Sequence, residues 1–225
     1  MTQPNLLRRA GAFAARLKGC TSGLALTEFA FSVPILLTLG LFGLETANFA
    51  MAHLRVSNIA VMTADNAARV RDSIDEADVI ELMTGAKMTG EGIDFAENGR
   101  IILSSVEPNT AGPDDESTGQ WIRWQRCDGR KNVVSSYGPQ GTGEDDDDLQ
   151  YVGDADNPIS AADGTAVMVV EVVYDYQPVI PNSFLEGRQI RYVSAFNVRQ
   201  RVNQALNNAG NLSNAQRRTC NHFEA

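Results

Sequence analysis

Residues 24–52 read LALTEFAFSVPILLTLGLFGLETANFAMA, and the sixteen residues 29–44 within them carry no charge. A helix rises about 1.5 Å per residue, so this stretch reaches ~43 Å and exceeds the hydrocarbon core of a bilayer, which is about 30 Å thick. Its Leu, Phe, Val and Ile side chains would occupy every face, which helices of globular proteins rarely show. We therefore predict that residues 24–52 form one transmembrane helix.

The charges change sign at this segment. The first 23 residues contain four basic and no acidic residues, so all 28 acidic residues of the 225-residue chain come later. The positive-inside rule then predicts that residues 1–23 are a basic cytoplasmic leader and that the C-terminal part lies outside. A net charge of −9 argues against nucleic acid as a partner, because phosphate recognition needs clustered Lys and Arg.

One acidic residue, Glu28, lies inside the apolar stretch, where a carboxylate costs a few kcal/mol unless it is paired or reaches the interface. A secretory signal peptide also begins basic and turns apolar, and Ala47-Asn48-Phe49-Ala50 could imitate its cleavage site. The apolar region of a signal peptide is shorter, however, at about 7–15 residues. If the chain is instead cut after Gly23, then Leu24 becomes the N-terminus and Glu28 the fifth residue, which gives the acid a role.

The start of the chain resembles the prepilin-peptidase site of type IV pilins. It has a basic leader, Gly23 at the cut, Leu24 after it, and Glu28 and Phe29 at the start of an apolar helix that contains a proline. Glu28-Phe29-Ala30 followed by Pro34 and Gly43-Leu44-Glu45 resembles the TadE-like pseudopilins of tight-adherence (Flp) pilus systems. The resemblance implies a minor pilin or pseudopilin, a structural component of type IV pilus biogenesis in cell adhesion. It would be cut after Gly23 and lie in the bacterial inner membrane.

The same resemblance implies the partners and the assembly residues. The partners are a prepilin peptidase, other pilins and pseudopilins, a pilus assembly platform and membrane lipid. The new α-amine of Leu24 is cationic near neutral pH, and Glu28 of an adjacent subunit can pair with it in the low dielectric of the membrane, with Phe29 beside it. Glu45, near the outer end of the span, is expected in water at the interface. The alternative function is an uncleaved, single-pass, membrane-anchored periplasmic binding module.

Small and apolar residues continue the helical spacing beyond the membrane, over residues 53–75. They recur every three or four positions and predict one helical stripe that packs on the chain's own outer domain: Val56, Ala60, Thr63, Ala67, Val70 and Ile74. Residues 72–76 combine a helix stop with a new N-terminal cap, so a second short helix is expected over residues 77–87.

In the outer domain, residues 76–225, the spacing of apolar residues changes near Arg100 from a helical period to alternation with a period of two. Strands are expected over residues 100–107, 120–126, 165–176 and 190–198. In the third strand, the face with Met168, Val170 and Val172 is the expected core side. A long helix followed by strands predicts an α+β fold with a mainly antiparallel sheet of about four strands, which the family resemblance implies to be a pilin-like head.

Three cysteines allow three pairings. Cys127 and Cys220 both lie in the outer domain, whereas Cys20 is held across the membrane in the leader. An oxidising compartment would favour a disulfide between Cys127 and Cys220, and free thiols are the alternative.

An acidic insert spans residues 139–163 and includes five consecutive acids at 144–148. Its spacing fails the EF-hand pattern, so a solvated loop is expected and a calcium site is the weaker alternative. The sequence contains no phosphate loop, no nucleophile elbow and only two histidines, His53 and His222. We therefore expect no enzyme activity, no cofactor and no metal.

Overall fold

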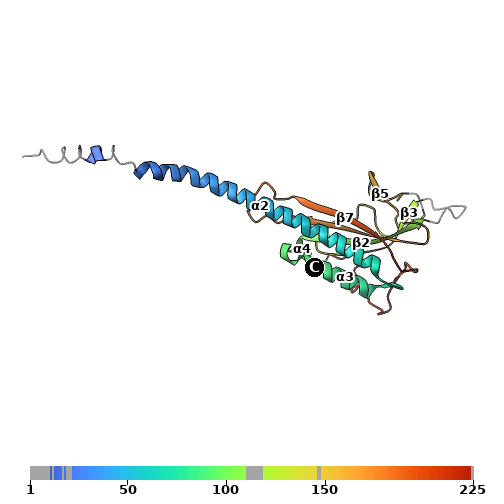
Figure 1. Ribbon diagram of the computed structural model, residues 1–225. Helices are drawn as coiled ribbons and strands as arrows, with labels where there is room; N and C mark the ends of the chain where they lie inside the picture. Colours follow the sequence, from blue (N-terminus) through green and yellow to red (C-terminus); the bar gives the residue numbers. More distant parts are fainter. Residues whose placement is uncertain are drawn as a thin grey trace, which may run out of the picture. The chain divides into compact units, whose positions relative to one another are not determined.

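The computed structural model describes residues 11, 13–16, 18, 22–109, 119–145 and 148–223. The chain divides into two compact units, Met1–Ala47 and Asn48–Ala225, and helix α2 (Ser22–Arg69) contains residues of both. Figure 1 follows the elements from the blue α2 to the orange strand β7. The fold is α+β, with one long apolar N-terminal helix, as predicted.

Helix α2 ends at Arg69, earlier than the expected 75. Asp72 has a positive φ of 58°, which a continuing right-handed helix does not allow. The chain then forms strand β1 (Ile74–Asp75), which pairs in parallel with β8 (Leu206–Asn207). These two short strands were not predicted.

Helix α3 (Glu76–Gly90) begins at a capping box, close to the expected residue 77. The Asp75 side chain accepts a hydrogen bond from the Ala77 amide, 3.0 Å away, and the Asp78 side chain accepts one from the Asp75 amide, 2.9 Å away. These bonds satisfy backbone donors that the first turn of a helix otherwise leaves free. A 3-10 turn η1 (Glu91–Ile93) and helix α4 (Phe95–Asn98) follow.

The main sheet has four antiparallel strands in the order β3-β2-β6-β7, which confirms the predicted sheet. Its strands match the four predicted segments within a few residues: β2 (Gly99–Asn109), β3 (Gly119–Asp128), β6 (Val167–Asp175) and β7 (Gln189–Asn197). A separate hairpin of β4 (Val152–Asp154) and β5 (Asn157–Ile159) lies in the acidic insert.

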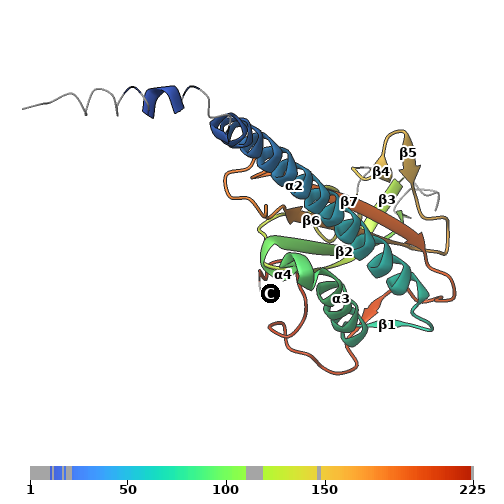
Figure 2. The ribbon, with the colours of Figure 1, turned by 60° about the vertical axis from the view of Figure 1, so that its left-hand side comes forward.

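Residues of α2 and α3 cover one face of the sheet. Figure 2 shows α3 beside the end of α2, on the same side of β2, β6 and β7. The predicted stripe packs here, since Val56, Ala60 and Ala67 are at most 1% exposed and share a core with Met168 and other strand residues. The expectation that the stripe packs on the chain's own domain is confirmed.

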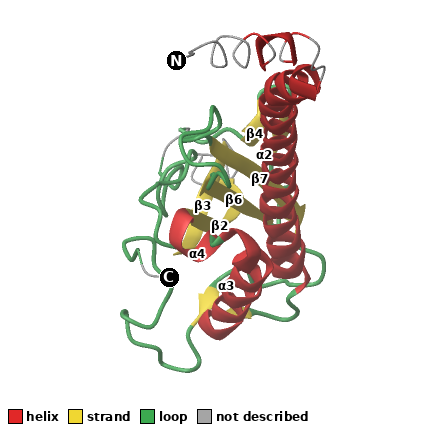
Figure 3. Ribbon diagram, turned by 90° about the vertical axis from the view of Figure 1, so that its left-hand side faces the viewer, coloured by secondary structure: helices red, strands yellow, loops and turns green. Residues whose placement is uncertain are grey.

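The other face of the sheet is buried too, although alternation suggested a single core side. Val167 and Val169 of β6 pack there with Leu149 and Ala161 of the insert, and Figure 3 shows loops on this side of the strands. A bulge in the β2–β3 pairing also sends Ile122 to this second core and Trp124 to the first, whereas both were expected on one face or at the edge.

Candidate functional site

The apolar part of α2, residues 24–44, exposes its large side chains in all directions. The Leu, Ile and Phe side chains of this segment are between 48% and 77% exposed. A surface of this kind is unfavourable in water and favourable in lipid. The helix is long and apolar enough to be a candidate membrane span, which is compatible with single-pass anchoring.

Hydroxyl groups within this segment are satisfied by the helix itself. Thr27 donates to the carbonyl oxygen of Leu24 at 2.8 Å, and Ser32 donates to that of Glu28 at 2.7 Å. Such bonds lower the cost of placing a hydroxyl in hydrocarbon. The charge of Glu28 is different in kind, because it is the only charged side chain in residues 24–44.

The four predicted processing and assembly residues lie in the first two turns of α2. Leu24 and Phe29 are 63% and 66% exposed, and the Glu28 side chain is also exposed. Leu24 and Glu28 are four residues apart and therefore share one face of the helix. A Cβ atom added to Gly23 would meet nothing within 4 Å, so packing does not require glycine there. Cys20 lies outside the described residues.

Glu45 was expected in water, but it is only 1% exposed. The expectation for this residue is wrong, because a position near the end of a span does not by itself make a side chain solvated.

Cys127 at the end of β3 and Cys220 near the C-terminus form a disulfide, as predicted, with their Cα atoms 4.7 Å apart. The Cys127 amide also donates to the carbonyl oxygen of Arg218 at 2.7 Å. The C-terminal segment is therefore bonded to the outer edge of β3 through both the backbone and a covalent bridge.

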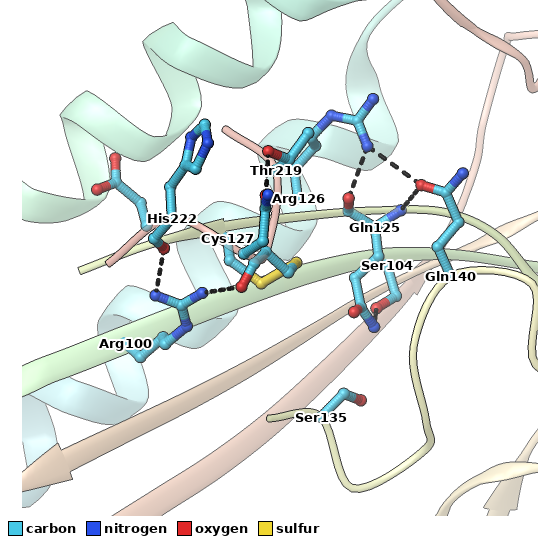
Figure 4. The surroundings of a disulfide bond; sticks show 12 residues. Arg100, Ser104, Gln125, Arg126, Cys127, Ser135, Gln140, Thr219 and His222 are labelled. Carbon is cyan, nitrogen blue, oxygen red and sulfur yellow. Dashed lines mark hydrogen bonds between the residues drawn. A yellow bond between two sulfur atoms is a disulfide. The ribbon is translucent and has the colours of Figure 1, made fainter. Parts of the chain in front are cut away.

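Arg100 lies beside this bridge, as Figure 4 shows. Its side chain is completely buried. Its guanidinium donates to the carbonyl oxygens of Gly129, Cys220 and His222 at 2.8, 2.7 and 2.9 Å. Burial lowers the pKa of Arg100, and the charge of Asp128 acts in the opposite direction. Sequence reasoning missed this residue, because an arginine at the start of a strand usually points to water and its partners lie up to 122 residues away.

Two buried carboxylates, Glu76 and Asp128, form ion pairs with basic side chains. Glu76 accepts hydrogen bonds from Arg126 at 2.6 Å and from Arg217 at 2.5 Å. Asp128 lies 3.3 Å from the Lys87 ammonium and 3.5 Å from the Arg218 guanidinium. These groups form ion pairs around two buried carboxylates.

Among the residues that the structure describes, no group of three His, Cys, Asp or Glu side chains could hold a metal ion. Residues 146–147 of the acidic run lie outside that description.

Comparison with known proteins identifies no relative: no family model, curated protein or solved structure matches this chain.

Proposed function

We propose that this chain is a minor pilin-like subunit, a TadE-like pseudopilin, that serves as a structural component in the biogenesis of a Flp-type pilus. The observation that carries the proposal is a helix with apolar side chains exposed on all sides and a single charged residue, Glu28, in residues 24–44. Such a helix needs lipid or other apolar helices around it, and the acid needs a partner there.

Processing after Gly23 supplies that partner. Cleavage would remove the basic leader and create a cationic α-amine on Leu24. This amine would lie about one helical turn before Glu28. A carboxylate alone at the centre of a membrane costs about 2.5–3.5 kcal/mol on insertion scales, and pairing with an amine of a neighbouring subunit offsets this cost.

The outer domain would then make lateral contacts outside the membrane. It contains a four-stranded sheet with both faces buried and a disulfide, which suits a rigid body in an oxidising compartment. The implied partners are a prepilin peptidase, other pilins or pseudopilins and the assembly platform.

The test compares Glu28→Gln with Ser32→Ala, a matched change of another exposed polar residue one turn further along the helix. A photo-crosslinker placed at Leu39, which is 64% exposed, reports contacts with other subunits in membranes of the native host. We expect both variants to insert normally, as judged by resistance to alkaline extraction. Only Glu28→Gln should lose most of its crosslinks to other pilins.

Equal crosslinking by the two variants would refute the role of Glu28 in assembly. Loss of membrane insertion in Glu28→Gln would instead assign the carboxylate to targeting. The uncleaved binding module is the outcome if no crosslinks to pilins form in the wild-type chain and the leader is retained.

A further inference from the structure

Residues 209–223 form an irregular segment with several turns, which we call the strap. The strap begins where the Ala209 amide donates to Asp75 at 2.7 Å. It then reaches β3, where the carbonyl oxygen of Arg218 accepts from the Cys127 amide at 2.7 Å and Cys220 forms the disulfide. The strap is thus attached to β3 by one backbone hydrogen bond and one disulfide.

The strap also supplies positive charge to two buried acids. The side chains of Glu76 and Asp128 are both 0% exposed, and they face Arg217 and Arg218 of the strap, which are each 28% exposed. If the strap left, Glu76 would retain only Arg126 and Asp128 only Lys87 as cationic partners among the ion pairs of the described residues.

A third buried charge, the cation of Arg100, depends on the strap for hydrogen-bond acceptors. Arg100 directs two of its three hydrogen bonds at strap carbonyls, those of Cys220 and His222, and its guanidinium lies 4.2 Å from the centre of the Phe223 ring. Because Arg100 is completely buried, it cannot replace these bonds with water while the strap is closed. Opening the strap would therefore hydrate three charged groups at once.

The disulfide is accessible from one side. A cleft of about 420 Å³ is lined by both cysteines together with Val133, Val134 and Pro139. Cys127 is 3% exposed and Cys220 is half-buried, so Cys220 is the more open residue of the bridge. Thiol exchange requires this access of an attacking thiolate to one sulfur of the bridge.

We propose that the strap is a redox-operated latch, closed when Cys127 and Cys220 are oxidised and released when a dithiol reduces them. The thiolate of the dithiol attacks Cys220 Sγ, and Cys127 leaves as a thiolate. The second thiol of the reductant then displaces Cys220, so that two electrons pass to the bridge and the reductant becomes a disulfide. The two protons of the dithiol end on the two cysteines. An oxidant of the disulfide class reverses the steps and closes the latch, independently of any role in a pilus.

Hydrogen exchange on the full chain in detergent tests this, in a Cys20→Ser background that leaves one pair of thiols. Reduction with dithiothreitol should raise amide exchange in residues 209–223 by about tenfold or more, while β2 and β6 stay protected. Reoxidation with glutathione disulfide should restore the protection. Unchanged exchange in the strap would overturn the proposal, and so would loss of protection across the whole sheet, because the bridge would then hold the entire fold rather than the strap.

The matched variant is Arg217→Gln with the bridge intact. We expect its strap to remain protected to within about threefold of the oxidised parent, since the covalent bond still holds it. Exchange as fast as in the reduced chain would mean that the ion pair holds the strap, which would also overturn the proposal.

Discussion

Replacing Glu76 with glutamine removes a buried carboxylate that faces two guanidinium groups. Glu76 is completely buried, Arg126 is 5% exposed at its side chain, and the two are joined at 2.6 Å. The change leaves the Arg126 charge buried without its main counter-charge. Breaking a buried pair in this way typically costs about 3–5 kcal/mol of the free energy of unfolding.

The same carboxylate makes stability depend on pH. Burial by itself would raise the pKa of Glu76, but the hydrogen bonds and charges of Arg126 and Arg217 outweigh it and hold the pKa below its ordinary value of 4.5. Glu76 therefore contributes stability above that ordinary value, and the contribution is lost as the pH falls through the lower, folded-state pKa. The Glu76→Gln variant should lack this part of the acid destabilisation.

Urea unfolding of the full chain in detergent, followed by tryptophan fluorescence, measures both effects. Trp124 is a suitable reporter because it is 3% exposed and donates to the carbonyl oxygen of Gln204. Glu97→Gln is the control, since Glu97 and Arg130 form a pair with side chains 52% and 56% exposed that should contribute less than about 1 kcal/mol. Equal losses in the two variants at pH 7, or an unchanged acid dependence in Glu76→Gln, would refute the reasoning.

Two further substitutions test the local structure by the same unfolding assay. Asp75→Ala removes the N-terminal cap of α3 and should cost about 1 kcal/mol, and a cost near zero would contradict the importance of the capping box. Met83→Ala opens a cavity in the core between α3 and the sheet and should cost about 2–5 kcal/mol. Met88→Ala on the same helix, at a side chain 65% exposed, should change stability by less than about 0.5 kcal/mol, and equal effects of the two would contradict the packing.

Local sequence patterns were enough to predict most helices and strands of the fold. Alternation in β6 and β7 predicted strands, and the cap at Asp75 predicted the start of α3, because each signal depends on a few neighbouring residues. Long-range features were not predictable in this way. Strands β1 and β8 have two residues each and pair Ile74 with Leu206, so neither segment has a pattern long enough to recognise.

The second core and the buried charges also depend on residues far apart in the sequence, and they were not predicted. Val167 and Val169 look like the solvent side of an alternating strand, but distant residues, among them Leu149 and Ala161 of the acidic insert, pack over them. Arg100 has no local partner, because its acceptors come from two distant segments. The disulfide could be predicted, since the topology expected from the sequence separates Cys20 from the other two cysteines. The interaction proposed for Glu28 involves a second subunit, and only the local spacing from Gly23 points to it.

The start of the mature chain tests the proposed function most directly. Protein purified from its native host and sequenced from its N-terminus, with its intact mass measured, should begin at Leu24. A chain that begins at Met1 or Thr2 and keeps the basic leader would contradict the pseudopilin proposal.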